Sequence, residues 1–306
     1  MNTEFQNILK CIKEKQICSI TRTANGNEYH RRFIPEDRLI LLGAGHVSQA
    51  TAQFAALLGF NIVVVDDRPD FANSDRFPMA GEIVCNKFTD AIDYLKITAD
   101  DYVCVLTRGH RYDADCVRHI MDGDTMPYYL GMIGSKRRVA DFREILRQEG
   151  YPQEKNDALH SPIGLKIGGI TPAEIGLSIC AELVQERSRN YIKDGIEYLE
   201  QTNCDIKTLD YLANSDEPRA FIMAIDSEGS TPAKPGAIMA INRFGKTYGT
   251  VGGGCSEASV IGRARKIIGT GKSDVVEVDM TNEVAAEMGM VCGGTLWVYI
   301  EDLKEG

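Results

Sequence analysis

The sequence lacks the features that mark membrane and secreted proteins. No apolar run approaches the roughly 20 residues that span a bilayer, and Asn61–Val65 is typical of the longest runs. The N-terminal segment carries several charges and no continuous apolar stretch, so it does not resemble a secretory signal. We therefore expect a cytoplasmic protein without a membrane partner.

Positive charge is also scarce. The chain has 34 Lys and Arg residues against 44 Asp and Glu residues, which gives a net charge of −10. Proteins that bind nucleic acid neutralise its phosphates with Lys and Arg. The charge balance therefore argues against a nucleic acid as the partner.

Local metal motifs are missing as well. None of the nine cysteines belongs to a Cys-x-x-Cys pair, so we predict no structural zinc or iron–sulfur site. An odd number of cysteines in a long chain without a signal sequence argues against a disulfide framework. Most of these cysteines stand among apolar residues, which is typical of buried thiols.

The length of 306 residues fits two domains of about 150 residues each. Residues 38–190 alternate short, continuous apolar runs with helical patterns, which predicts an α/β fold with a Rossmann-like, doubly wound parallel sheet. A further helix is expected to begin with Thr171 as N-cap, Pro172 in first position and Glu174 completing a capping box. The expected strands are Leu39–Leu42, Ile62–Val65, Ile83–Val84, Tyr102–Leu106 and Tyr128–Ile133, and the other expected helices are roughly 47–58, 89–96, 113–121 and 136–149.

The remaining residues form three segments. Residues 1–37 are predicted to hold an amphipathic helix and a hairpin that turns at Asn25-Gly26, a pair typical of two-residue turns. Residues 191–217 are polar and are interpreted as a connector. Residues 218–306 are dense in glycine and are predicted to form a smaller Gly-rich α+β domain. Its expected strands are Phe221–Ile225, Ile238–Ile241, Val275–Val278 and Leu296–Ile300, with one helix at about 256–268.

A glycine-rich turn follows the first strand of the Rossmann-like domain. Gly43 allows a tight turn, and Gly45 lets the backbone approach a phosphate at a helix N-terminus. Asp66 ends the next strand 23 residues later, where an acid that binds a ribose belongs. Ser48 replaces the third glycine of the pattern. The turn predicts a nucleotide or phosphate site, unless the crevice is empty or serves another purpose.

Polar residues at other strand ends point to the same crevice, because the carboxyl ends of parallel strands share one edge of a sheet. Arg68 follows one of these strands, while His46 and His110 are expected near the crevice. Each histidine could titrate near neutral pH or bind a metal, or could simply cap a loop by hydrogen bonding. A second anion site is expected at a helix start formed by Gly134, Ser135 and Lys136.

Two cysteines of the smaller domain stand beside glycine runs. Gly253 and Gly254 precede Cys255 at a predicted helix start that also carries Glu257, and a helix N-terminus lowers the pKa of a thiol. Cys292 precedes another glycine pair. The pattern indicates a ligand or sulfur-handling site with close backbone approach, or alternatively tight turns with incidental buried thiols.

Together these residues resemble the xanthine dehydrogenase accessory family, the XdhC/CoxI proteins. In the usual family order the Gly-Gly-Cys domain comes first, whereas here the Rossmann domain comes first. The chain therefore resembles a permuted member, and residues 1–37 resemble the segment that usually joins the two domains. The matching strings are Leu41–Val47, Asp66–Pro69, Arg76–Pro78, Tyr129–Ser135, Ser161–Gly164, Thr171–Ile175, Gly229–Pro232, Lys234–Gly236, Gly249–Cys255 and Cys292–Gly294.

The resemblance implies a role in maturing molybdenum hydroxylases such as xanthine dehydrogenase. Family members are thought to bind the molybdenum cofactor, a molybdopterin, to favour its sulfurated form and to help insert it into the target enzyme. On this chain the crevice would hold a phosphate or nucleotide part of the ligand, and Cys255 and Cys292 would be candidates for contact with its metal-bearing or sulfur-bearing end. The expected partner is the hydroxylase apo-enzyme, with a cysteine desulfurase as a further candidate and a homodimer as the candidate assembly.

Two other functions stay open. An NAD-dependent oxidoreductase would bind its cofactor through Gly43, Gly45 and Asp66, because the carboxylate suits an unphosphorylated ribose, and would use His110 as acid or base. A scaffold would bind the hydroxylase without any small ligand. A maturation chaperone is preferred over a catalyst because two glycine-rich sites accompany the resemblance.

Overall fold

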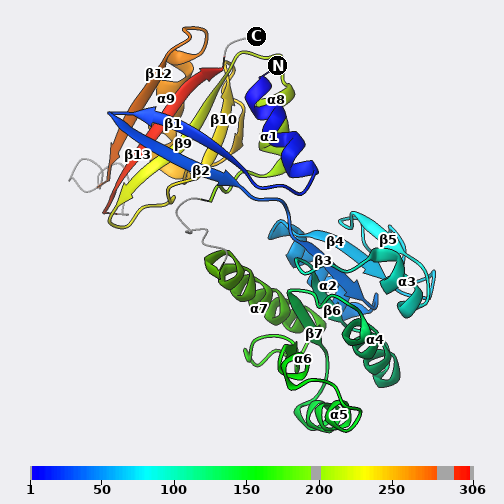
Figure 1. Cartoon of the computed structure of the whole chain (residues 1–306). Coiled ribbons are helices and arrows are strands. Elements are labelled where there is room, and N and C mark those ends of the chain that lie inside the picture. The colour runs from blue at the N-terminus through cyan, green and yellow to red at the C-terminus, as the bar shows by residue number, and fades with distance from the viewer. Residues whose placement is uncertain (1, 194–200, 281–292, 304–306) are drawn as a thin grey trace. The chain divides into compact units, whose positions relative to one another are not determined.

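The computed structural model describes residues 2–193, 201–280 and 293–303, with only the backbone at residues 191–193 and 254–256. The chain divides into two compact units (Figure 1). One unit combines Met1–Pro35 with Tyr191–Gly306, and the other is Glu36–Asn190. None of the helices in the described part of the chain combines the length and the apolar composition needed to cross a membrane.

The unit Glu36–Asn190 is built on a six-stranded parallel sheet with the strand order β5-β4-β3-β6-β7-β8, which confirms the predicted Rossmann-like fold. The order reverses between β3 and β6, and doubly wound sheets bind their ligands at such a reversal. The strand β8 was not expected, because a strand of two residues leaves no pattern in a sequence. The strands are β3 (Arg38–Leu42), β4 (Asn61–Val65), β5 (Glu82–Val84), β6 (Tyr102–Val105), β7 (Tyr129–Met132) and β8 (Leu159–His160).

Both faces of this sheet are covered by helices. Alternate residues of β3, such as Ile40, pack with α3, α4 and α5 on one face, and the residues between them, such as Leu41, pack with α2 and α7 on the other. The strands are therefore apolar along their whole length. The helices are α2 (His46–Leu57), α3 (Phe88–Leu95), α4 (His110–Asp122), α5 (Lys136–Gln148), α6 (Gln153–Asp157) and α7 (Pro172–Lys193).

Two of these helices show how sequence signals mark a helix start. The amide of Glu174 donates to Thr171 Oγ1 at 3.2 Å and the Glu174 carboxylate accepts from the Thr171 amide at 2.8 Å, which confirms the predicted capping box at the start of α7. The helix α4 begins at His110 rather than near residue 113. Its first turn is polar and exposed at most positions, so the apolar periodicity does not include it.

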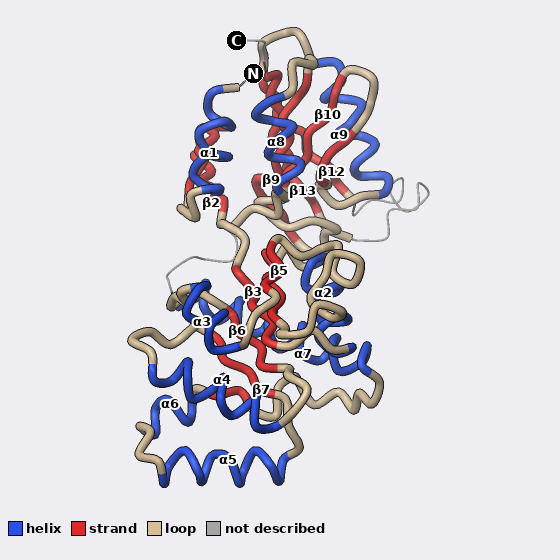
Figure 2. Tube along the Cα trace, turned by 90° about the vertical axis from the view of Figure 1, so that its right-hand side faces the viewer, coloured by secondary structure: helices blue, strands red, loops and turns tan. Residues whose placement is uncertain are grey.

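The other unit is built on a five-stranded antiparallel sheet with the strand order β11-β10-β9-β13-β12 (Figure 2). The helix α9 covers one face, where Val260 and Ala264 pack against the sheet. The helices α1 and α8 and the hairpin β1-β2 cover the other face. The elements are α1 (Thr3–Lys13), β1 (Cys18–Ala24), β2 (Asn27–Phe33), α8 (Ile206–Asn214), β9 (Arg219–Glu228), β10 (Ile238–Asn242), β11 (Thr247–Gly249), α9 (Gly254–Ile267), β12 (Ser273–Asp279) and β13 (Thr295–Leu303).

This unit also contains the N-terminal helix and hairpin and the segment 191–217. The sequence had suggested that both are separate from residues 218–306. The ring of Phe5 lies 5.1 Å from that of Phe221 on β9, and Arg22 Nε donates to Glu301 at 2.7 Å. An apolar helix face indicates burial in a sequence, but it does not identify the surface that buries it. The hairpin turns through Asn25 at φ 52° and Gly26 at φ 82°, as a two-residue turn requires.

Candidate functional site

The turn between β3 and α2 lies at the point where the sheet order reverses. Its first residue, Gly43, has φ 114°, a conformation that L side chains rarely adopt. A Cβ atom at Gly43 would lie 2.3 Å from the carbonyl oxygen of Leu106, at the end of β6. Only glycine therefore allows the turn to pack so closely against the neighbouring strand.

Gly45 has the opposite surroundings. It is the N-cap of α2, no side chain caps that helix end, and a Cβ atom at Gly45 would meet nothing within 4 Å. The start of α2 therefore has no side-chain cap and has open space at Gly45, and uncapped amides at a helix start bind anions. His46 is the exposed first residue of α2, and the buried hydroxyl of Ser48, where the third glycine was expected, has no hydrogen-bond partner.

Asp66 is fully buried at the end of β4 and holds the glycine turn in place. Its carboxylate accepts hydrogen bonds from the Ala44 amide at 2.8 Å, from Arg68 Nε at 2.8 Å and Nη2 at 2.9 Å, and from the Arg68 amide at 3.1 Å. Burial acts to raise the pKa of Asp66, but these hydrogen bonds outweigh burial and leave the pKa lowered. A carboxylate offers about four acceptor positions, so a ribose hydroxyl could bind here only if Arg68 turned away.

Three guanidinium groups surround the turn. Arg68 stacks on the ring of Phe71 at 3.7 Å, and Arg76 donates to the carbonyl oxygen of Ala44 at 3.2 Å. Arg108 forms a bidentate ion pair with Asp67, with Nη2 donating to Oδ2 at 2.8 Å. Arg68 and Arg108 are balanced by Asp66 and Asp67, so Arg76 adds one net positive charge beside the uncapped helix amides, which suits an anionic ligand.

Arg68 was predicted from the sequence to be a candidate ligand-binding residue, whereas Arg76 and Arg108 were not. The signal for Arg108 was its position three residues after the end of the strand β6. Arg76 lies in a loop between β4 and β5, far from any strand end in sequence. Its approach to the glycine turn depends on the fold of that loop, which no local pattern describes.

His110 lies at the carboxyl end of β6 as the first residue of α4. Its Nδ1 atom is 3.3 Å from Arg138 Nη1 on α5 and 3.9 Å from Asp113 Oδ2. Burial raises the pKa of Asp113, although hydrogen bonds from the side chain and amide of Thr107 act in the opposite direction. His110 therefore has an acidic neighbour and a basic neighbour, and the structure brings it together with the start of α5.

The start of α5 carries the second predicted anion site. Ser135 is the N-cap, and its hydroxyl accepts a hydrogen bond from the Arg138 amide at 3.5 Å. Gly134 is partly exposed, and Lys136 is exposed as the first residue of the helix. Unlike the first turn of α2, this helix end already has a side-chain cap.

The Gly-Gly-Cys segment lies in the other unit. The helix α9 begins at Gly254 after an N-cap Gly253 with φ 68°, so Cys255 is in its first turn, and Glu257 is partly buried nearby. The side chain of Cys255 and the whole of Cys292 lie outside the described residues.

Two glycine-rich segments of this unit border the same loop between β9 and β10. A Cβ atom at Gly252 would lie 3.0 Å from the Pro232 side chain, and a Cβ atom at Gly229 would lie 3.2 Å from the Gly293 oxygen. Gly252, which precedes Cys255 in the sequence, and Gly293, which follows Cys292, therefore both border the loop 229–233. Within the described part of the chain, no group of three or more His, Cys, Asp or Glu residues is arranged to hold a metal ion.

Comparison with known families gives two matches in sequence order. Residues 39–183 match the family described as the XdhC Rossmann domain. Residues 212–279 match the family described as XdhC and CoxI. The Rossmann match precedes the other, as the sequence analysis predicted.

Two curated proteins share about half of the chain. An uncharacterized protein, YqeB, of Escherichia coli is 36% identical over 49% of this chain and 27% of its own length. A protein of Bacillus subtilis that is described as a probable subunit of xanthine dehydrogenase is 31% identical over 53% of this chain and 47% of its own length. The chain thus spans about a quarter and about half of these two relatives.

A solved structure is also similar. A crystal structure described as a xanthine dehydrogenase from Bacillus halodurans has 32% sequence identity and a TM-score of 0.48, covering 55% of this chain and 48% of that chain.

Proposed function

The chain belongs to the XdhC/CoxI family of xanthine dehydrogenase accessory proteins, and from that premise we propose that it binds the molybdenum cofactor. In this proposal it helps to sulfurate the cofactor or to insert it into the apo-enzyme of a molybdenum hydroxylase. The chain acts as a maturation chaperone rather than as a catalyst of substrate turnover.

The observation that carries the proposal is the arrangement of groups at the glycine turn. The first turn of α2 presents amides that no side chain caps, Gly45 leaves the space in front of them open, and Arg68 and Arg108 stand at neighbouring strand ends. A molybdopterin carries a phosphate, and these groups are suited to bind it. When bound, the cofactor would supply the molybdenum centre, whereas these residues would bind and orient its phosphate end.

Cys255 and Cys292 are the candidates for handling sulfur. The position of Cys255 in the first turn of α9 supports this role, because a helix N-terminus favours the thiolate form of a cysteine. A cysteine desulfurase would be the donor of the sulfur, and a homodimer is the proposed assembly. The segment that bears Cys292 leads, like that of Cys255, to the loop 229–233.

The alternative function, an NAD-dependent oxidoreductase, has weaker support from the geometry. Such an enzyme needs a free acid at the end of β4 to accept ribose hydroxyls. The acceptor positions of Asp66 are occupied by Arg68 and by the Ala44 amide. The open site therefore favours a ligand bound by its phosphate over one bound by an adenosine ribose.

The variant Gly45→Val tests the proposal. It places a branched side chain in the space in front of the α2 amides, where the structure has room for it, so the fold should survive. We expect the variant to lose retention of added molybdenum cofactor in gel filtration. Gly262→Val is the matched control, because Gly262 also faces open space, on α9 in the other unit, and it should retain the cofactor. Equal retention by Gly45→Val and the wild-type protein would contradict the proposed site.

A further inference from the structure

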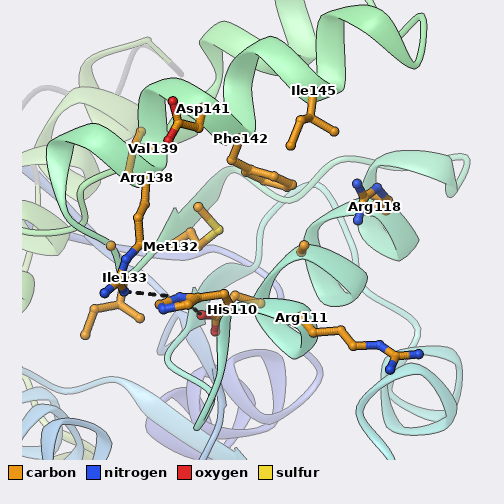
Figure 3. Close-up of a pocket in the computed structure, with 13 residues that line it drawn as sticks. His110, Arg111, Arg118, Met132, Ile133, Arg138, Val139, Asp141, Phe142 and Ile145 are labelled. Carbon is orange, nitrogen blue, oxygen red and sulfur yellow. Dashed lines mark hydrogen bonds and ion pairs between the residues drawn. The ribbon is translucent and has the colours of Figure 1, made fainter.

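A groove of about 320 Å³ lies between α4 and α5 (Figure 3). It lies beside the edge of the sheet that also carries the glycine turn. This volume is within the range of about 300–1,000 Å³ that is typical of small-ligand sites. Its apolar walls are formed by Ala114 on α4 and by Val139, Phe142 and Ile145 on α5, with Met132 of β7 between them. The ring of Phe142 points from α5 toward α4 in Figure 3.

Basic side chains gather at the end of the groove that meets the sheet edge. His110 and Arg138 lie 3.3 Å apart there, whereas Arg111 also lines the groove but extends away from this pair in Figure 3. Arg118, further along, is already paired with Glu149 at 2.7 Å. No carboxylate within the described part of the chain forms an ion pair with Arg111 or Arg138.

Two acidic residues also line the groove. The carboxylate of Asp113 accepts hydrogen bonds from Thr107 and faces His110, and Asp141 is on the first half of α5. The acceptor capacity of Asp113 is therefore partly used within the protein, whereas Arg138 contacts only the neutral ring atom of His110 among the groups that line the groove.

On the opposite side of the glycine turn, the side chains are engaged with one another. Phe71 is covered by Arg68 at 3.7 Å, and Arg76 lies 5.0 Å from the same ring. Asp66 is fully buried and Asp67 is held by Arg108. The side chains on the β4 side are therefore paired with one another, whereas the β7 side holds the groove of about 320 Å³.

From these observations we propose that the groove between α4 and α5 binds a planar heteroaromatic ring that carries an anionic substituent. The apolar walls pack against the ring, Phe142 provides a stacking surface, and Arg138, with His110 beside it, binds the anionic group. This inference deepens the proposed function and rests on it for the ligand's identity. The ring is either the pterin of the cofactor or the base of a nucleotide attached to it.

The test uses Ala114→Trp, which fills the groove, and Asp115→Trp as the matched control, because Asp115 is the exposed next residue of α4 and does not line the groove. The probes are pterin-6-carboxylate, guanosine 5′-monophosphate and inorganic phosphate, each titrated against the full chain by calorimetry. Ala114→Trp should weaken the binding of a ring-bearing probe roughly tenfold, the size of effect that loss of one stacked base has. Inorganic phosphate should bind both variants and the wild-type chain equally.

A second variant, Ile145→Glu, changes the same groove from the α5 side at an exposed position. It keeps the test valid if Ala114→Trp does not fold. Selective binding of pterin-6-carboxylate identifies the ring as the pterin, and selective binding of the nucleotide identifies it as the base. The inference is overturned if neither ring-bearing probe binds, or if both groove variants bind them as the wild-type chain does. Retention of the molybdenum cofactor, measured on the same samples, distinguishes the two proposals. If the wild-type chain and the groove variants retain the cofactor equally, the proposed function is supported but the groove is not its binding site.

Discussion

The backbone amide of Ala44 donates a 2.8 Å hydrogen bond to the buried carboxylate of Asp66. This bond joins the turn after β3 to the end of β4, and Arg68 neutralises the same carboxylate from the solvent side. The acid at the end of β4 therefore shapes the glycine turn. Its usual partner, the ribose of a dinucleotide, would have to compete with groups of the protein itself.

The two glycines of this turn should respond differently to substitution. Gly43→Ala places a Cβ atom 2.3 Å from a backbone oxygen at a φ of 114°, and should lower the free energy of unfolding by about 2–4 kcal/mol. Gly45→Ala faces open space and should lower it by less than about 1 kcal/mol. Urea unfolding of the two variants measures both values. Equal losses would show that the turn does not pack as described.

Asp66→Asn should change the acid stability of the protein. The pKa of Asp66 is lower in the folded protein than in the unfolded chain, so its ionised form stabilises the fold above the unfolded pKa of about 4. That contribution disappears as the pH falls through the lowered pKa. The variant should therefore be less stable than the wild-type protein at pH 7, and the difference should shrink below about pH 4.

Urea unfolding at a series of pH values measures this difference. Asp115→Asn, at an exposed position of α4, is the matched control and should follow the wild-type curve. A stability difference for Asp66→Asn that is constant from pH 7 into the acid range would contradict the role of the carboxylate.

The glycine turn, the acid 23 residues later and the capping box of α7 were predictable because each depends on local sequence. The bonds of Asp66 with Arg68 and Ala44 were not, since they depend on how two strand ends meet. The strands β8 and β11 have two and three residues. They were not predicted because such short strands form by pairing with neighbouring strands and leave no local sequence pattern. The groove between α4 and α5 depends on the spacing of two helices, which no periodicity records.

The N-terminal helix should stabilise the unit that contains residues 191–306. Phe5 is fully buried against that unit, so Phe5→Ala should lower its free energy of unfolding by about 3–5 kcal/mol. In calorimetry we expect one transition to move and the other to stay. Phe88→Ala on α3, in the core of the other unit, should move the second transition instead. A Phe5→Ala variant that shifts neither transition would contradict the grouping of residues 1–35 with this unit.

Cys255→Ala should separate cofactor binding from sulfur handling. We expect the variant to retain the molybdenum cofactor, since the glycine turn is unchanged, and to fail to activate a hydroxylase apo-enzyme that needs a sulfurated cofactor. Cys85→Ala, at an exposed cysteine of the other unit, is the control and should activate normally. Full activation by Cys255→Ala would exclude a persulfide at this position.

The most direct test of the proposed function is the identity of the small molecule that the protein carries. The chain is loaded with a cell extract that contains molybdenum cofactor and is repurified. The released molecules are identified by mass spectrometry, with molybdenum measured in parallel. We predict that a pterin and molybdenum are recovered from the wild-type chain and that both are absent from Gly45→Val. Recovery of a nicotinamide dinucleotide without pterin or molybdenum, or of no ligand at all, would contradict the proposed function.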